Sequence, residues 1–235
     1  MHAHCAEHGA RTYGGFSESI VVDQHYVVNI PEGMDLASAA PLLCAGISTY
    51  SPLMRFGLIA NKRLGVVGIG GLGHIAVKLG RALGCHVTAV SRGMKKRSSV
   101  LEHLGAHEFI DSTDAEAMRK AQASIDFILD TIPAVHDLGT FLELLRVDGK
   151  YIVVGLPPEK LQLQASSIVQ DRKILAGSKI GGMHEMQEML DFCCRHKISS
   201  DVEVVPAASI NECFDRVVTS SVRYRYVVDV STIAS

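Results

Sequence analysis

The chain has 235 residues, of which 47% are hydrophobic and 20% charged, enough for one packed domain or one domain plus a fragment. Its net charge of −2 excludes the strongly basic surface that nucleic acids and anionic membranes select. The sequence has no uninterrupted apolar span, and its six cysteines form no Cys-x-x-Cys pair, so we expect a cytoplasmic protein with reduced thiols.

The first thirty residues give weak structural signals. Residues 1–15 are polar and show no periodicity. Four side chains among them are of metal-binding type: His2, His4, Cys5 and His8. Because no predicted strand or helix holds them in a tetrahedral arrangement, we interpret this cluster as incidental. Two β-rich runs follow, residues 19–22 and 26–30, and we expect both to be strands.

Residues 34–58 have the apolar periodicity of a helix. Asp35 is a suitable N-cap, and Pro41 predicts a break close to it. The apolar residues expected on one buried face are Leu36, Ala39, Ala40, Leu43 and Ile47.

The strongest pattern lies between residues 64 and 84, where a short apolar run is followed by G-x-G-x-x-G at Gly68, Gly70 and Gly73. Helical spacing then continues to Gly84, which ends the helix. Glycines at this spacing allow a tight turn, a close approach of the backbone to a pyrophosphate and packing of the helix against the strand. An anion would bind to free N–H groups at the positive end of the helix dipole. We therefore predict a dinucleotide site.

A second predicted strand, residues 85–91, ends where a ribose-binding acid is expected. The sequence has hydroxyl and cationic side chains there instead: Ser91, Arg92, Lys95, Lys96 and Arg97, with Gly93 and Met94 between them. This favours a 2′-phosphate and hence NADPH over NADH. The alternative interpretation of the basic run is a solvated helix start.

Strands and helices continue to alternate, as in a doubly wound parallel sheet. Helices are expected at residues 97–104 and 136–146, and the third to sixth strands at residues 108–111, 127–132, 150–154 and 173–180. A ligand should lie beyond the carboxyl ends of such strands, where Gly68, Ser91, Thr131 and Gly155 fall.

The C-terminal quarter of the chain begins with a predicted helix over residues 183–195. Its apolar stripe consists of Met186, Met189, Leu190 and Cys193, which we interpret as core packing. A strand at 203–205, a helix near 209–218 and a strand at 223–230 follow. We expect these last elements to leave the nucleotide domain and rejoin the strands of residues 16–30.

Five stretches stand in the order found in one known family: TYGGFSESIVVD, PLLCAGISTYSPL, GIGGLGHIAVKLGRALG, GSKIGGMHEMQEMLDF and VRYRYVVDV. In them the chain resembles the cinnamyl-alcohol-dehydrogenase branch of the zinc-containing medium-chain alcohol dehydrogenases. The resemblance implies an α/β fold, with a doubly wound, six-stranded Rossmann sheet and the remnant of a GroES-like β substrate domain. The implied domains are residues 1–45, 46–181 and 182–235, the first and last belonging to the substrate domain.

In that family a zinc ion with three protein ligands polarises the substrate oxygen while hydride passes between the substrate and the nicotinamide. The resemblance implies that Cys44 is a zinc ligand and that Ser48 replaces the usual threonine near the nicotinamide. The family's other zinc ligands and its four-cysteine lobe are not found in this sequence. Since one thiolate cannot hold a catalytic zinc, we expect a chain without most of the substrate domain that binds nucleotide but is weak or inactive as a dehydrogenase.

The resemblance also implies a set of cofactor-binding residues. The pyrophosphate turn is Gly68, Ile69, Gly70, Gly71, Leu72 and Gly73. The 2′-phosphate segment is Ser91, Arg92, Gly93, Met94, Lys95 and Lys96, in which Arg92 and Gly93 replace hydroxyl residues. The nicotinamide side is Ser48, Thr131, Gly155, Ser178, Lys179 and Ile180, and Lys179 stands where small or apolar residues are commoner. We interpret His74 as a packing or capping residue at the helix start rather than as a base.

The favoured hypothesis is therefore an NADP(H)-dependent, zinc-type alcohol dehydrogenase acting on a small aromatic or allylic alcohol or aldehyde, with neither nucleic acid nor membrane as a partner. A second hypothesis is a non-catalytic NADPH-binding module or dimerisation partner. A zinc-free reductase of the quinone-reductase type is disfavoured by Cys44 and GSKIGGMHEMQEML. The family usually joins sixth strands edge to edge, so we expect a homodimer through residues 173–180.

Overall fold

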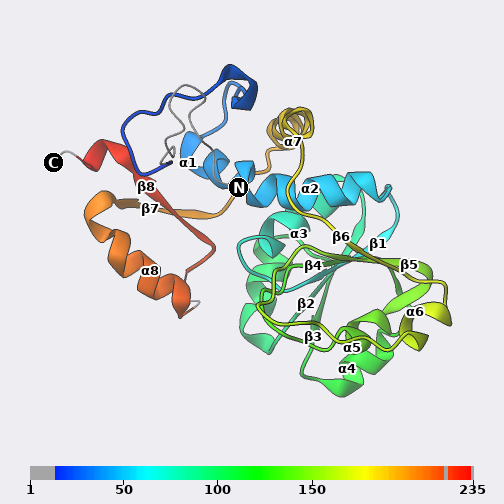
Figure 1. Ribbon diagram of the computed structural model, residues 1–235. Helices are drawn as coiled ribbons and strands as arrows, with labels where there is room; N and C mark the ends of the chain where they lie inside the picture. Colours follow the sequence, from blue (N-terminus) through cyan, green and yellow to red (C-terminus); the bar gives the residue numbers. More distant parts are fainter. Residues whose placement is uncertain (1–13, 220–221, 234–235) are drawn as a thin grey trace.

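The computed structural model describes residues 14–219 and 222–233, and these contain two parallel sheets (Figure 1). Their strands are β1 (Arg63–Val67), β2 (His86–Ser91), β3 (Glu108–Asp111), β4 (Ile125–Asp130), β5 (Leu145–Val153), β6 (Ile174–Gly177), β7 (Val202–Pro206) and β8 (Arg225–Asp229). The first six pair in the order β3-β2-β1-β4-β5-β6, and β7 pairs with β8. This is the strand order of a doubly wound sheet, so the predicted fold class is confirmed.

The helices lie between and around these strands. They are α1 (Leu36–Ala39), α2 (Ala45–Arg55), α3 (Gly73–Ala82), α4 (Ala115–Lys120), α5 (Leu138–Leu142), α6 (Ser166–Val169), α7 (Met183–Arg195) and α8 (Ile210–Val218). Short 3-10 segments are η1 (Gln24–Tyr26), η2 (Ala40–Leu43), η3 (Met94–Lys96), η5 (Ala207–Ser209) and η6 (Val230–Thr232), and η4 (Ser99–His103) is π-helical. None of the helices in the described residues is long and apolar enough to cross a membrane.

Strands β1 to β6 and the helices around them form the larger part of the molecule, which we call the six-stranded unit. Successive residues of β1 belong to different cores: Val66 packs with Val77 of α3 on one face, and Val67 packs with Val90 and with Leu142 of α5 on the other. The sheet is therefore covered on both faces, which explains why its strands read as continuous apolar runs.

A third core lies where α2, α3 and α7 pack on one another. It contains Leu42, Ile47, Ile75, Leu79, Met186, Met189, Leu190 and Cys193, all buried. The methionine stripe of α7 is thus core packing, as predicted. Helix α3 is buried on two sides, by the sheet and by this cluster, so its start has little freedom to move.

The helix expected over residues 34–58 is broken into α1, η2 and α2. Asp35 caps α1 as predicted, accepting the Ser38 N–H at 2.8 Å. The expected buried face was wrong at three positions: Leu36 is 71% exposed, Ala40 is exposed, and Leu42 rather than Leu43 is fully buried. The cause is η2, whose tighter winding at Pro41 shifts the helical phase between the two α-helices.

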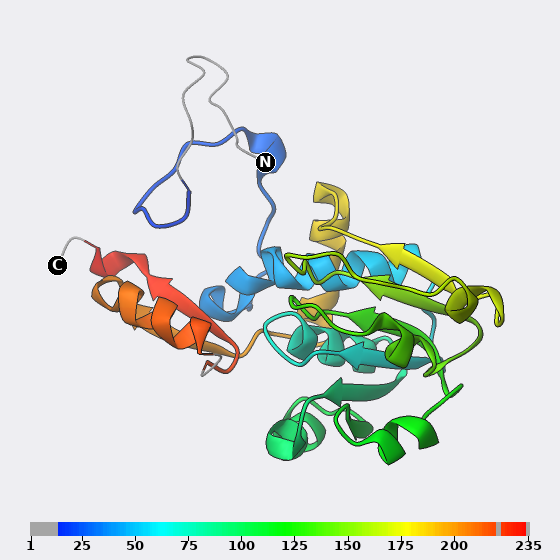
Figure 2. The same ribbon diagram turned by 60° about the horizontal axis from the view of Figure 1, so that its bottom comes forward.

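Strands β7 and β8 with α8 between them form a separate parallel βαβ unit, which we call the C-terminal unit. Val204 lies opposite Val227 in its ladder. Both ribbon views place this unit to one side of the large sheet (Figures 1 and 2). The expectation that these elements rejoin strands of residues 16–30 was wrong, because the two C-terminal strands pair with each other.

The strands expected at residues 19–22 and 26–30 were also wrong. Residues 14–30 contain only η1, and Val21 is 93% exposed. A β-rich sequence forms a strand only where a second strand accepts and donates its backbone hydrogen bonds, and no described strand pairs with this segment. The cluster of His2, His4, Cys5 and His8 lies outside the described residues.

Several boundaries differ from the sequence expectation. The helix expected at 136–146 is limited to α5, because β5 already begins at Leu145. The helix expected at 97–104 is the π-helical η4 with a short 3-10 segment before it. Helices α4 and α6 were not predicted, and both are short enough to depend on tertiary packing rather than on periodicity.

Candidate cofactor and active site

The glycine turn joins β1 to α3 at the carboxyl edge of the large sheet. Gly68 has a φ of +86°, which favours glycine, and a Cβ at Gly73 would collide with the Gly68 carbonyl. Helix α3 can therefore begin directly against the end of β1. Its N-cap residue, Leu72, provides no side-chain cap, and the His74 N–H in the first turn donates to the Gly70 carbonyl at 3.1 Å. The positive end of the helix dipole therefore lies at this edge without a capping side chain, which favours an anion there.

Loops from three strands meet the turn at this edge. The Thr131 hydroxyl after β4 lies 2.7 Å from the Gly68 carbonyl oxygen. Gly155 after β5 donates its N–H to the Asp130 carbonyl at 3.0 Å, and Ser178 after β6 donates to the end of β5 at 3.1 Å. The structure thus brings Gly68, Thr131, Gly155 and Ser178 into one row along the sheet edge.

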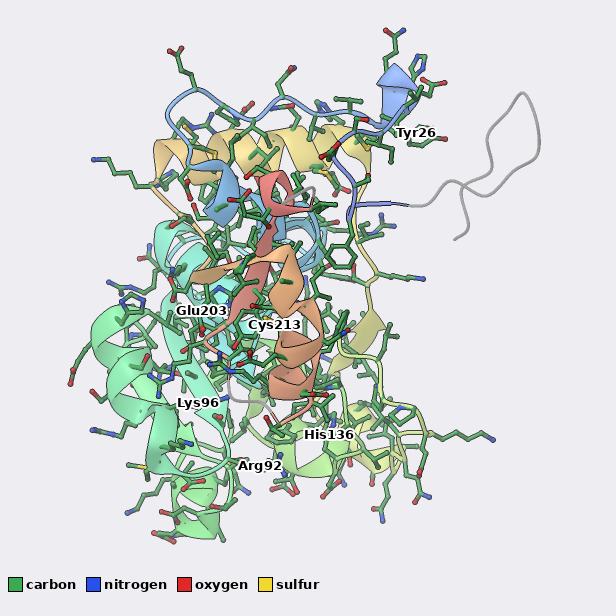
Figure 3. All side chains as sticks on the ribbon, turned by 90° about the vertical axis from the view of Figure 1, so that its left-hand side faces the viewer. Tyr26, Arg92, Lys96, His136, Glu203 and Cys213 are labelled. Atoms are coloured by element: carbon green, nitrogen blue, oxygen red, sulfur yellow. The ribbon has the colours of Figure 1, made fainter. Side chains whose placement is uncertain are left out.

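A group of cations lies beside the turn, at the end of β2. Lys96 is half-buried and donates from Nζ to the Ile69 carbonyl at 2.5 Å. Burial lowers the pKa of Lys96, and the positive charges of Arg223, Arg92 and Lys95 lower it further. Figure 3 shows Arg92 and Lys96 on the edge that faces the C-terminal unit. The charges that act on Lys96 are all positive, which is the arrangement that a phosphate group requires.

The Asp111 carboxylate contacts the segment after β2, but it is occupied by hydrogen bonds within the protein. Asp111, at the end of β3, accepts the Gly93 N–H at 2.8 Å and both the N–H and the hydroxyl of Thr113. The hydrogen bonds from Thr113 and then Gly93 lower the pKa of the Asp111 carboxyl. Its carboxylate is engaged in shaping the turn at Gly93, which has a φ of +66°.

Arg225 at the start of β8 reaches the glycine turn from the C-terminal unit. Its guanidinium packs directly on Gly71, where any Cβ would collide with it. The Nε atom of Arg225 is buried and has no hydrogen-bond partner. A buried, unpaired cationic donor next to a helix start indicates a place for an anionic ligand.

A buried polar cluster supports the loops after β4 and β5. Asp130 accepts the Ile132 N–H at 2.9 Å, and the Nε2 atom of His136 lies 2.9 Å from its other oxygen, with angles outside those of a hydrogen bond. Burial raises the pKa of the Asp130 carboxyl, and it also raises the pKa of the neighbouring Tyr151 hydroxyl. These groups fix the backbone on which Thr131 and Gly155 lie.

Cys44 and Ser48 stand one turn apart at the start of α2, and the Ser48 N–H donates to the Cys44 carbonyl at 3.1 Å. Cys44 is exposed to an open pocket of about 360 Å³. The residues lining this pocket are Gly15, Phe16, Ala40, Pro41, Cys44, Arg225, Tyr226, Val227 and Val228. Lys179 and Ile180 are exposed beyond β6 and do not line it.

A metal ion needs more ligands than this pocket supplies. Within residues 14–219 and 222–233, no group of three or more His, Cys, Asp or Glu side chains could hold one. Cys44 is the single residue of such a type among those lining the pocket. The described residues therefore do not fit a catalytic zinc.

His74 lies directly under the glycine turn and is completely buried. Its Nδ1 atom is 3.1 Å from the Gly70 carbonyl oxygen, and its Nε2 atom is 3.1 Å from the Ser200 hydroxyl. Burial lowers the pKa of His74 to about 4. A neutral, fully packed imidazole is a poor base, so the prediction of a packing role at the helix start agrees with this geometry.

Sequence reasoning missed four residues of this region: Arg223, Arg225, Asp130 and His136. Both arginines lie in the VRYRYVVDV stretch that carried the family resemblance, but more than 120 residues separate Arg223 from Lys96 and Arg225 from Gly71. No local pattern predicts that contact. The Asp-Thr-Ile-Pro-Ala-Val-His sequence at residues 130–136 was available as a signal, since buried acids at strand ends need a partner.

A model of the zinc-binding dehydrogenase family matches residues 71–195. This chain belongs to that family. It is 49% identical over 224 residues to a mannitol dehydrogenase from Petroselinum crispum, an alignment that covers 95% of this chain and 66% of the relative. It is also 49% identical over 224 residues to cinnamyl alcohol dehydrogenase 2 from Arabidopsis thaliana, covering 94% of this chain and 60% of that protein.

Two solved structures of family members are similar to this one. A cinnamyl alcohol dehydrogenase from Sorghum bicolor superposes with a TM-score of 0.93 at 45% identity, covering 96% of this chain and 64% of that one. The Helicobacter pylori enzyme, solved in complex with NADP(H), gives 0.86 at 36% identity over 95% of this chain and 63% of that one. The resemblance to the cinnamyl-alcohol-dehydrogenase branch is thus confirmed, and the chain spans less than two thirds of the length of these relatives.

The buried His74 predicts a dependence of stability on pH. Besides burial and the Gly70 carbonyl, the groups that act on its pKa are Lys78, Asp201 and Arg225. Because the pKa is about 4 in the fold and 6.5 ordinarily, the unfolded chain binds the extra proton first as the pH falls. The stability contributed by a neutral His74 is complete above pH 6.5 and decreases between 6.5 and 4, by up to about 3 kcal/mol.

Urea unfolding of the wild type and of His74→Phe at pH 7.5, 6 and 5 measures this contribution. We expect the wild type to lose more stability than the variant over that range. Equal pH slopes for the two proteins would contradict the assignment of a buried neutral imidazole.

Proposed function

We propose that this chain binds NADPH across the carboxyl ends of β1, β2 and β4. The observation that carries the proposal is the convergence of Lys96, Arg92, Lys95 and Arg223 beside the glycine turn. Proteins that prefer NADH place an acid at the end of the second strand, where it accepts from a free ribose hydroxyl. Here that place is cationic, which favours the phosphorylated cofactor.

The residues present fit this cofactor in three places. The glycine turn, the start of α3 and Arg225 would hold the pyrophosphate, and the cationic group would hold the 2′-phosphate. Thr131, Gly155 and Ser178, with Ser48 on α2, would orient the nicotinamide end. When bound, NADPH supplies the hydride. The protein's task is to orient it and to keep water away from it.

We further propose that the complete activity is that of an alcohol dehydrogenase acting on aromatic or allylic aldehydes. The relatives are named for two substrate classes, cinnamyl alcohols and mannitol. The pocket beside Cys44 is lined mostly by apolar side chains, and Arg225 is the one charged residue among the described residues that line it, so it offers few hydrogen-bond partners for a polyol. A flat apolar substrate therefore suits it better.

A second candidate function is a non-catalytic NADPH-binding module. It is favoured by one observation, the absence of a metal-ligand set around Cys44 in the part of the chain that the structure describes. The two candidates share the cofactor site and differ only in turnover.

The charge of Lys96 should decide the choice of cofactor. We expect the wild type to bind NADPH more tightly than NADH, and Lys96→Met to weaken NADPH binding by roughly 10-fold to 100-fold, because a charge-assisted contact to the phosphate is lost. Binding of NADH should change little. Calorimetric titration of both cofactors measures this, with Lys120→Met as a control that removes an exposed lysine of α4. A wild type that prefers NADH would overturn the cofactor assignment.

Bound zinc and turnover should distinguish the dehydrogenase from the non-catalytic module. Purified protein incubated with zinc should bind NADPH and retain no stoichiometric zinc after dialysis, with little turnover of cinnamyl or coniferyl aldehyde. Metal analysis and the decrease in NADPH absorbance measure the two quantities. Zinc-dependent turnover near the rate of a full-length relative would refute the non-catalytic alternative. It would also refute the conclusion that the residues around Cys44 cannot hold a catalytic zinc.

We propose a homodimer that joins two copies of β6 at the edge of the large sheet. In the described residues β6 pairs only with β5, and Ile174 and Leu175 on it are exposed. An apolar edge strand invites pairing with another strand. Sedimentation analysis should give twice the mass of the chain, and Leu175→Glu should give the monomer. A monomeric wild type would contradict the proposal.

We propose that residues 46–181 are the nucleotide domain and that residues 1–45 and 182–235 belong to the substrate domain. A cytoplasmic location is supported by the five cysteines in the described chain, Cys44, Cys85, Cys193, Cys194 and Cys213, which are free thiols.

A further inference from the structure

His74 is in contact with three segments that are far apart in the sequence. Its Nδ1 atom lies 3.1 Å from the carbonyl oxygen of Gly70 in the glycine turn. Its Nε2 atom lies 3.1 Å from the Ser200 hydroxyl and accepts the Asp201 N–H at 3.3 Å. Its ring stacks on Tyr224, with 4.5 Å between the ring centroids. One buried side chain therefore connects the turn, the connection after α7 and the residue before β8.

The partners of the two ring nitrogens determine the form of the imidazole. The Gly70 carbonyl can only accept, so Nδ1 carries the hydrogen. The Asp201 N–H can only donate, so Nε2 is the acceptor. A neutral histidine in this one tautomer satisfies both partners at once. Asparagine or glutamine can replace one nitrogen but is too short or too differently shaped to satisfy both across the same gap.

The segments that His74 joins hold the C-terminal unit against α3. Lys78, one turn further along α3, donates to the Ser199 carbonyl at 2.9 Å and to the Asp201 carboxylate at 2.6 Å. The Tyr224 N–H donates to the Asp201 carbonyl at 3.2 Å. The anchor of the C-terminal unit is therefore Tyr224 with residues 199–201, and His74 lies in the middle of it.

Tyr224 stands between two arginines that act on the dinucleotide site. Arg225 packs on Gly71, and Arg223 is one of the charges that act on Lys96. Figure 3 shows the C-terminal unit, marked by Glu203 and Cys213, next to the edge that carries Lys96. A ring stacked on Tyr224 and bonded to Gly70 fixes the distance between these arginines and the turn.

We propose that His74 is a positioning residue for the dinucleotide site, which holds Arg225 of the C-terminal unit over the glycine turn and Arg223 within reach of Lys96. The inference rests on the proposed NADPH binding, and it assigns to His74 the task of completing that site with cations from a distant part of the chain. His74 itself touches no phosphate. It acts through the stack with Tyr224 and the hydrogen bonds to Gly70 and Asp201.

The decisive variant is His74→Phe, which keeps a ring against Tyr224 and removes the hydrogen bonds of both ring nitrogens, to Gly70, Ser200 and Asp201. We expect NADPH binding to weaken by about 10-fold to 100-fold, since contacts between charged groups are misplaced. The salt dependence of the dissociation constant should become shallower, because fewer fixed cations face the ligand. A loss of stability alone would not alter that slope. Val77→Ala, a core change on the same helix and away from the turn, is the matched control and should leave both quantities unchanged.

A double-mutant cycle with Arg225→Met tests the route of the effect. If His74 acts through Arg225, the two changes are coupled and their effects are not additive. The dissociation constant of the double variant for NADPH should then be at most about threefold higher than that of the weaker-binding single variant. Ser200→Ala removes one hydrogen bond only and should give a smaller change in the same direction. It keeps the test valid if His74→Phe does not fold.

Hydrogen exchange without cofactor separates this inference from the proposed function. In His74→Phe, the amides of residues 199–206 and 224–229 should exchange faster, while those of β1, β4 and β5 should not. The role of His74 would be overturned if the variant showed unchanged hydrogen exchange. It would also be overturned if the wild type binds NADPH and the variant keeps the same affinity and the same salt dependence. A wild type that does not bind NADPH would overturn the proposed function, and the exchange would still decide whether His74 anchors the C-terminal unit.

Discussion

The structure depends on the close approach of α3 to the end of β1. Gly73 lies against the Gly68 carbonyl with no room for a Cβ, and Gly68 itself has a positive φ. This contact places the start of a buried helix at the edge of the sheet, with N–H groups that no side chain caps. It also places the next residue, His74, beneath the turn. Both the proposed anion site and the anchor of the C-terminal unit follow from two glycines.

Hydrogen bonds to Asp130 join the loops around this turn to one another. The Asp130 carbonyl accepts the N–H groups of Val154 and Gly155, and its carboxyl accepts that of Ile132. A single buried residue thus joins the loop after β4 to the loop after β5. The Thr131 hydroxyl extends the connection to Gly68. A cofactor lying along this edge meets a surface whose parts are fixed before it binds, which lowers the entropy that binding costs.

The sequence predicted the elements whose information is local. The apolar run before Gly68 and the glycine spacing define β1, the turn and α3, because burial on both faces and a tight backbone turn each leave a direct pattern. The predictions failed where contacts between segments distant in the sequence determine the structure. Residues 19–22 have the composition of a strand, yet composition supplies no partner strand, and Val21 is exposed. The basic run at the end of β2 was found, but Arg223 and Arg225 were not, since only the packing of Tyr224 on His74 brings them there.

The positive charges at the site carry an energetic consequence. Lys96 is half-buried among Arg92, Lys95 and Arg223, and its pKa is lowered by burial and by each of these neighbours. Arg225 buries an unpaired Nε atom on the glycine turn. Docking of the C-terminal unit therefore brings like charges together and costs free energy as long as no anion lies among them. An anionic ligand removes this cost, so the docked arrangement favours the ligand and the ligand favours docking to the same extent. The hydrogen bonds of His74 and Lys78 to residues 199–201 maintain the arrangement without the ligand, which explains why the anchor is built from buried polar contacts rather than from the arginines themselves.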